Sequence, residues 1–564
     1  MPQEYQRDGD NGFIGLNSRD NPASLPAGMV SKSQNFRLDR GIATVRNGIR
    51  RLTSTNILNK TIYGIGTYIN GDGQEIFVIV VTNGVHTFNP ETEVFSTLIS
   101  FPSGETITTK VGCDVVTTTG TTVNTAFIFI SRGHSKRPLK CTIDTTTYLI
   151  TGIVAMPTSG TGAEFPNCSG LLYYCNRLIA IGQHHSKGYT PTARSRDSVC
   201  VSNYLDFEHW DALDVYTFNE GSNDEVIAVA PWTLTEFVVF LRNSIFYVNV
   251  GTTRYANSDP LTASTALMKS LVTDIGCKAK NSVVLAGGGI IFLSDNGIYI
   301  MNPTQVGSNE SIRLLTSSEP LSAPIDDVIQ RINKSYIQNS VGVYWNNRYY
   351  LSVPLDDSVD NNCILVYNFL IKNWESVDTY PAGFDAIEFA VGKKSNQRRL
   401  FSFDTDQGVF LLEELDYDEY GASTGKPILP FPSDPPLILA ESSSQNVIIL
   451  NTASFTPNQI NGELNTRLYT YNQLKDKRFS TAEIDLVSNG GSYIETYADT
   501  INQDTASLID SFGFSQDEDS TRRIAIRKIA YGLKLRFLNK TLRTSIRGVS
   551  ITSTIMGKQN ISKK

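Results

Sequence analysis

The sequence predicts an almost entirely β protein: a β-propeller of about six to eight blades, with an extended N-terminal arm before it and a β-sandwich after it. Two observations lead to this fold class. The chain contains 25 Tyr and 27 Phe, and its short runs of Thr, Val and Ile favour strands over helices. In addition, an apolar strand, a tight polar turn and a second strand recur along the chain at intervals of about fifty residues, close to the period of propeller blades.

Residues 1–55 are expected to form the arm. Pro22 and Pro26 fix their own backbone and push the preceding residues into extended conformations, so no useful helix fits there. The run at 33–39 then alternates polar and apolar residues, as a strand does. The arm therefore has little apolar surface of its own to bury against itself.

Residues 56–425 are expected to form the propeller, because seven hairpins recur there. Asn-Gly and similar pairs tolerate the positive φ angles that tight hairpins require. The turn centres are Asn83-Gly84, Arg132-Gly133, Asn176-Arg177, Asn243-Ser244, Asn296-Gly297, Asn346-Asn347 and Gln407-Gly408. An ordinary set of sandwich hairpins without a ring is the competing interpretation, and the regular spacing favours the propeller.

A domain boundary is predicted after the last hairpin. An acidic run at 413–419 precedes a segment, 425–445, that holds five prolines. Strand patterns resume beyond it, so residues 426–564 are expected to form a separate β-sandwich. The alternation of Leu533, Leu535 and Phe537 with basic residues predicts a strand with an apolar inner face and a basic outer face.

The sequence contains no motif that singles out an active site. Glycoside hydrolysis requires two carboxylates at a defined separation, and no stretch identifies such a pair. The seven cysteines form no C-x-x-C motif and the five histidines are scattered, so we expect no metal, no cofactor and no catalysis. A propeller glycoside hydrolase or a glycan-binding protein acting on bacterial surface polysaccharide remains the alternative.

The sequence shows no pattern of a secreted or membrane-spanning protein. The first residues lack the apolar core of a signal peptide, and no apolar run is long enough to cross a bilayer. We therefore expect synthesis in a reducing cytoplasm with free, mostly buried thiols.

Charge is distributed unevenly along the chain. The net charge is −7, but the last 45 residues hold twelve Lys and Arg and no acidic residue, which leaves 37 basic against 56 acidic residues in the first 519. Contact with a partner or a neighbouring subunit is the preferred interpretation, ahead of direct DNA binding or a merely solvated sheet face. The candidate contact residues are Arg37, Arg46, Arg50, Arg522, Arg523, Arg527, Lys528 and Arg536.

The N-terminal stretch GLNSRDNPASLPAGMVSKSQNFRLDRGIATVRNGIRRL, at 15–52, resembles the opening of a family of short-tailed bacteriophage virion proteins. These are the tail nozzle proteins, also called tail tubular protein B, and the related packaged-DNA stabilisation proteins. The segments IIFLSDNGIYI and TSIRGVSITSTI are also similar to members of that family. The resemblance covers the first fifty residues best and is more pattern-like over the propeller.

The resemblance implies a structural, non-enzymatic protein of the virion tail that is made in the host cytoplasm. It would form a homohexamer below a ring of adaptor subunits similar to tail tubular protein A, with tail fibre or tailspike proteins as further possible partners. In such a ring, the extended N-terminal arm would lie across another subunit. Genomic DNA would be retained by this ring before infection and would pass through it without sequence recognition. An acidic body rich in Ser and Thr suits such a conduit, since it does not hold phosphates.

Overall fold

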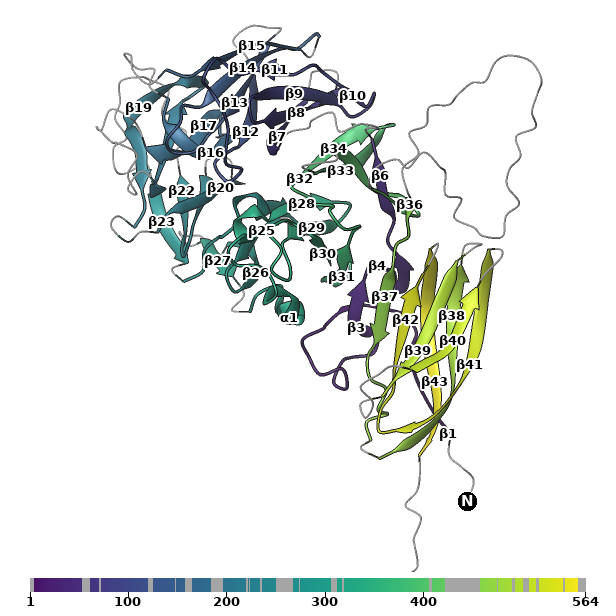
Figure 1. The fold of residues 1–564 in the computed structure, drawn as a ribbon. Helices are drawn as coiled ribbons and strands as arrows, with labels where there is room; N and C mark the ends of the chain where they lie inside the picture. Colours follow the sequence, from purple (N-terminus) through teal and green to yellow (C-terminus); the bar gives the residue numbers. More distant parts are fainter. Residues whose placement is uncertain are drawn as a thin grey trace, which may run out of the picture. The chain divides into compact units, whose positions relative to one another are not determined.

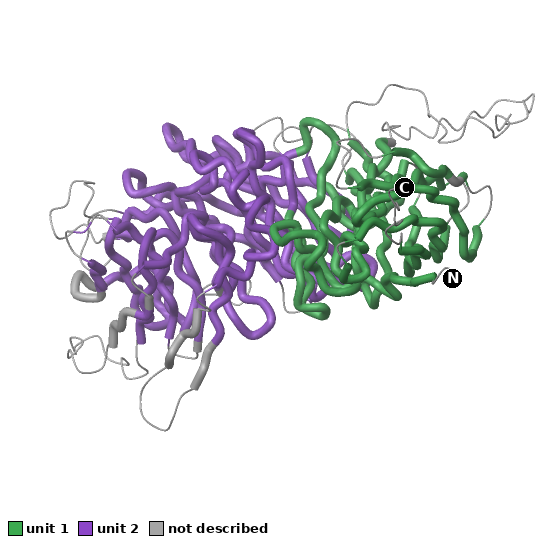
Figure 2. Tube along the Cα trace, turned by 90° about the horizontal axis from the view of Figure 1, so that it is seen from below, with its two compact units in different colours: residues 1–55, 365–384, 410–564 green, residues 56–364, 385–409 purple. Residues whose placement is uncertain are grey.

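The computed structural model shows a nearly all-β protein, and Figure 1 labels most of its strands. It describes residues 5–52, 61–69, 73–119, 125–147, 149–157, 165–183, 196–219, 222, 224–233, 236–249, 267–272, 274–305, 312–316, 319–404, 408–420, 457–473, 475–488, 492–500, 507–513, 517–540 and 543–555. The chain forms two compact units, coloured in Figure 2. One consists of 1–55, 365–384 and 410–564, and the other of 56–364 and 385–409.

Seven sheets follow one another within the described residues, and each is one blade of a propeller. The first three blades are β7–β11 (Ile62–Ile69, Glu75–Val81, Gly84–Asn89, Val94–Phe95, Ile99–Ser100), β12–β15 (Val115–Thr119, Thr125–Ile130, Leu139–Asp144, Ile150–Ala155) and β16–β19 (Asn167–Tyr174, Arg177–Gln183, Ser198–Asn203, Asp206–Thr217). The next three are β20–β23 (Val226–Thr233, Glu236–Leu241, Ile245–Asn249, Leu267–Val272), β24–β27 (Val284–Ala286, Gly289–Ser294, Gly297–Gln305, Ile312–Thr316) and β28–β31 (Val341–Trp345, Arg348–Val353, Cys363–Asn368, Asn373–Thr379).

The seventh blade contains one strand from the start of the chain. It consists of β32 (Glu388–Lys394), β33 (Gln397–Asp404), β34 (Gly408–Leu415) and the N-terminal strand β6 (Gly48–Arg51). Strand β32 lies against β7 of the first blade, which closes the ring. Helical turns within the described residues include the 3-10 helices η3 (Lys280–Ser282), η4 (Ala323–Ile325) and η5 (Ile337–Asn339) and the short helix α1 (Asp326–Ile329).

The predicted propeller is confirmed, and each of the seven predicted hairpins falls in a different blade. Most of their turns join the second and third strands of a blade. Those at Asn176 and Asn346 instead join the first and second strands, and both residues have the positive φ angles, 56° and 48°, that tight turns require.

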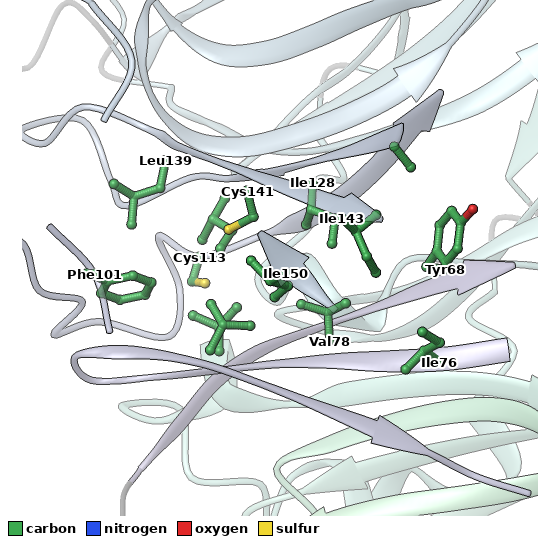
Figure 3. Packing of buried hydrophobic residues seen from close by; sticks show 14 of the residues in the cluster. Tyr68, Ile76, Val78, Phe101, Cys113, Ile128, Leu139, Cys141, Ile143 and Ile150 are labelled. Atoms are coloured by element: carbon green, nitrogen blue, oxygen red, sulfur yellow. The ribbon is translucent and has the colours of Figure 1, made fainter. Parts of the chain in front are cut away.

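Apolar side chains fill the space between neighbouring blades. Between the first and second blades, Val78 and Val80 of β8 belong to one cluster with Ile128 and Ile130 of β13, and all four are fully buried. Figure 3 shows Val78 and Ile128 within this cluster. The central strands of the blades are buried on both faces, and this explains why they read as continuous apolar runs rather than as alternating patterns.

Two six-stranded sheets form the β-sandwich of the other unit. The β43 sheet has the order β4 (Phe36–Asp39), β5 (Ile42–Val45), β43 (Thr544–Ile555), β38 (Lys477–Ser488) and β41 (Glu518–Ala530), and β1 (Tyr5–Asp10) also pairs with β43. The β42 sheet has the order β2 (Gly15–Leu16), β3 (Met29–Gln34), β37 (Gly462–Thr466), β42 (Lys534–Asn539), β39 (Tyr493–Asp499) and β40 (Ser507–Gly513). A further pair joins β35 (Asp418–Glu419) to β36 (Pro457–Asn458).

The N-terminal residues differ from the predicted arm. Residues 5–52, called the N-terminal segment below, do run extended, but they supply strands to both sandwich sheets and to the seventh blade of the same chain. The sandwich therefore includes residues from both ends of the chain rather than 426–564 alone. The physical reason is that the segment's apolar residues, such as Phe13 and Phe36, find a core to bury in, and both are fully buried. The predicted proline-rich boundary lies outside the described residues.

All seven cysteines are free thiols, and six of them are buried. Burial raises the pKa of Cys113, Cys141 and Cys277 to about 12, and that of the half-buried Cys175 to about 11. We therefore expect a thiol reagent at pH 8 to modify at most one cysteine, Cys175, in the native protein, and all seven in denaturant. Rapid modification of several thiols in the native protein would contradict this packing.

Candidate functional site

The first strands of the blades surround a cavity of about 290 Å³, called the axial cavity below. Successive first strands lie against one another around this ring, as β7 does with β12 and β12 with β16. The central channel of a propeller is a common place for a ligand site. The cavity is lined by Gly64, Ile65, Cys113, Asp114, Val115, Val116, Leu171, Ile181, Ala228, Val229, Lys280, Asn281, Val283 and Glu388.

Lys280 joins blades across the axial cavity. It lies in η3, before the fifth blade, and its Nζ is 2.7 Å from Oδ1 of Asp114 at the start of the second blade. The same Nζ donates to the backbone oxygens of Cys113, at 3.2 Å, and Ser169, at 3.0 Å. Asp114 Oδ2 in turn accepts the N–H of Leu171 at 3.0 Å. The charges therefore connect the second, third and fifth blades.

Further contacts involve the seventh blade, and two of the residues that make them, Asn281 and Glu388, line the axial cavity. The Asn281 amide donates to Oε2 of Glu388 at 3.2 Å, and the ammonium group of Lys110 donates to the backbone oxygen of Ile387. Burial raises the pKa of Glu388, while burial lowers the pKa of Lys110. Both shifts indicate that water hydrates these two groups poorly. The charged forms of Glu388 and Lys110 therefore stabilise each other.

The chemistry available in the axial cavity is limited. The Cys113 thiol is no nucleophile at neutral pH, since burial raises its pKa to about 12. Among the described residues, no group of three or more His, Cys, Asp and Glu side chains is placed to hold a metal ion. The lysines and carboxyl groups face one another, so the arrangement holds blades together.

His134, in the loop between β13 and β14, is expected to make stability depend on pH. Burial lowers its pKa to about 4, and its buried Nδ1 has no hydrogen-bond partner among the residues that the structure describes. The folded protein therefore keeps it neutral at pH values where the unfolded chain protonates it, so stability falls as the pH drops from about 6.5 to about 4, by up to about 3 kcal/mol. Urea unfolding between pH 7 and pH 4 should show a flatter profile for His134→Gln. An unchanged profile would contradict the burial of this side chain.

Sequence reasoning missed these axial residues. Lys110, Asp114, Lys280 and Glu388 lie in four separate stretches and form no motif. Their proximity depends on the closure of the ring, which no local pattern shows.

The predicted arginines of the N-terminal segment have partners within the chain. Arg37 makes two hydrogen bonds to the carboxylate of Asp378, at 3.0 and 2.5 Å, and also pairs with Glu413. Arg46 is fully buried and binds Asp418 through two bonds of 2.9 and 2.8 Å. Arg50 is half-buried in β6. Subunit contact stays a prediction for these residues, but the side chains of Arg37 and Arg46 are already buried.

The predicted basic residues near the C-terminus lie on the sandwich. Four of them meet an acceptor in their own unit: Arg522 with Glu518 at 2.6 Å, Arg523 with Glu483 at 3.9 Å, Lys528 with the Ala498 oxygen at 3.2 Å, and Arg536 with Glu463 at 3.0 Å. Arg523 is nevertheless 69% exposed, and Arg527 is exposed at a β-bulge where its φ is 54°. The inward Leu533, Leu535 and Phe537 are fully buried, as their alternation predicts.

The comparisons with known proteins identify no family for this chain. No family model matches the chain, and no curated protein matches it. Among solved structures, the chain is similar to Hsv2 of Kluyveromyces lactis, with 10% identity and a TM-score of 0.31 over 63% of this chain and 98% of that one. It is also similar to PorZ, a surface component of the type-IX secretion system of Porphyromonas gingivalis, with 12% identity and a TM-score of 0.34 over 65% and 38%. A luciferin-regenerating enzyme matches with 10% identity and a TM-score of 0.30 over 65% and 96%.

These likenesses are too distant to indicate an activity.

Within the described part of the chain, no helix has the length and apolarity that crossing a membrane would require.

Proposed function

We propose that this protein is a structural, non-enzymatic component of a short-tailed phage tail. It forms a homohexameric nozzle below the adaptor ring, retains packaged DNA and conducts it into the host. The supporting observation is the place of the residues that carry the family resemblance. Asn35, Arg37 and Arg46 all lie in the resembling stretch, and all are buried in hydrogen-bonded contacts that fix the fold. Because these residues fix the fold, the resemblance in this stretch supports a shared architecture with the tail nozzle family.

The charge distribution supports the same proposal. The acidic body gives a DNA conduit little to hold phosphates with, since non-specific DNA binding depends on Lys and Arg. The exposed Arg523 and Arg527 of β41 leave a basic surface on the sandwich for an adaptor subunit or a neighbour. Tail fibre or tailspike proteins could use other surfaces of the same ring.

We expect the double variant Arg523→Glu and Arg527→Glu to weaken binding to the purified adaptor ring at least about tenfold, because the charge of the proposed docking surface is reversed at two exposed positions. The double variant Arg40→Glu and Lys372→Glu changes the charge equally at two other exposed positions and serves as the control. Co-sedimentation with the adaptor ring measures the binding of both double variants. Equal binding by both variants would remove β41 from the docking surface.

Tail function itself is tested in virions. Particles assembled without this protein should contain adaptor rings but lose their packaged DNA. Addition of the purified protein during assembly should restore DNA retention. DNA-filled, stable particles that lack the protein would contradict the proposal.

One observation favours the alternative, a propeller glycoside hydrolase. Glu388, whose pKa burial raises, lines the axial cavity together with Asp114, and glycoside hydrolases use two carboxyl groups, one of which has a raised pKa. Release of reducing sugar from host surface polysaccharide, abolished by Glu388→Gln, would establish this alternative. The pairing of Asp114 with Lys280 argues for a structural role instead.

A further inference from the structure

Every strand of the N-terminal segment extends the edge of a sheet. In the β43 sheet, β1 and β5 lie beside β43 and β4 lies beyond β5, while β2 and β3 end the β42 sheet and β6 ends the seventh blade. Within the described residues, no strand from the rest of the chain lies outside these strands. The segment could therefore leave all three sheets without separating any other pair of strands.

The surface that receives the segment is acidic. Asp378 and Glu413 bind Arg37, and Asp418 binds Arg46. Glu375 accepts the backbone N–H of Leu38 at 2.6 Å. Without the segment, Asp378, Glu413 and Asp418 would lose the arginines that they face, so the surface suits a basic, extended occupant.

Apolar burial gives the same surface its affinity for the segment. Phe13, Val30, Phe36 and Leu38 are all fully buried. The Phe36 ring lies so close to Gly462 of β37 that a Cβ built there would be 2.8 Å from it. The segment thus completes a core and is bound in one register.

Sequence separation favours an occupant from another copy. Thr44 of β5 pairs with Ser545 of β43, which lies 501 positions later, and Arg46 meets Thr379 333 positions later. The segment is thus made first and its acceptor strands last, so it stays unpaired while most of the chain is synthesised. In an assembly, a neighbour presents the same acceptor at high effective concentration.

We propose that the N-terminal segment is exchanged between copies, so that the segment of one subunit completes the sheets of the next. This inference rests on the proposed oligomeric function and names the contact that would hold the ring. It requires no new contacts, because each acceptor receives the same strands that the structure shows.

A disulfide between β5 and β43 tests the exchange. Thr44 and Ser545 are directly opposed, and their hydroxyl oxygens are 2.9 Å apart. Opposed antiparallel residues have the Cα separation that a disulfide requires. The full-length double variant Thr44→Cys and Ser545→Cys is oxidised in its assembled state and run on a denaturing gel without reductant. The matched control is Thr481→Cys and Thr552→Cys, a directly opposed pair whose two strands both lie near the C-terminus.

Exchange predicts that most of the first variant runs as covalent multimers, whereas the control runs as a monomer with an internal disulfide. Both variants become monomeric on reduction. If the first variant runs as an oxidised monomer although light scattering shows an oligomer, exchange is overturned and the proposed function stands. If light scattering shows a monomer even with the adaptor, both fail.

Discussion

Replacing Arg46 with alanine is expected to destabilise the sandwich unit by about 3–5 kcal/mol, because the change leaves a buried carboxylate without its cation. The guanidinium uses all five of its donors, on Asp418, Asn35, and the backbone oxygens of Asn47 and Thr379. Its carbon also lies 4.1 Å from the centre of the Tyr380 ring. Although burial opposes the charge, Asp418 raises the pKa of Arg46, so the group stays ionised.

The midpoint of urea unfolding measures this loss. The exposed Arg40→Ala should shift the midpoint little, whereas Arg46→Lys should remain well below the wild type, since lysine cannot form the two parallel bonds. The double variant with Asp418→Ala should recover part of the stability, because no charge is then left alone. A wild-type midpoint for Arg46→Ala would show that the ion pair does not hold the segment.

Replacing Lys280 with alanine is expected to destabilise the propeller by about 2–3 kcal/mol. The ammonium group is the cation nearest the Asp114 carboxylate and also satisfies two backbone oxygens across the axis. The cost is smaller than for Arg46, because Asp114 is 23% exposed and water can reach it.

Arg331→Ala is the matched control for Lys280→Ala. Arg331 also pairs with one aspartate, Asp356, but both side chains are more than half exposed, so the expected loss is within about 0.5 kcal/mol. The two variants are compared by thermal unfolding. Equal melting temperatures would mean that the axial charges do not tie the blades.

The propeller could be predicted because each blade contains a hairpin that can be recognised from a short stretch of sequence. A tight turn between two apolar strands is encoded in about a dozen residues, and Asn296-Gly297 or Asn346-Asn347 identifies a hairpin without knowledge of the rest. One such hairpin per blade gives a number close to seven, even though the turns do not all occupy the same position in the blade.

The role of the N-terminal segment could not be predicted in the same way. Alternation at 33–39 indicates extended chain but not its distant partners: Ser33 and Gln34 of β3 pair with β37, and Leu38 of β4 donates to Glu375, both hundreds of residues later. For the same reason, Arg37 and Arg46 could be recognised as notable but not as buried, since Asp378 and Asp418 carry no signal that points to them. Asp8 and Asp10 likewise bind Arg467, 459 and 457 positions away.

The central claim of this account is that the chain works as a subunit of a ring. The most direct measurement is the mass of the purified, full-length protein in solution by light scattering, alone and with the adaptor ring. A mass of six copies, either alone or on the adaptor, is the predicted result. A monomer that remains a monomer and does not bind the adaptor would contradict the account.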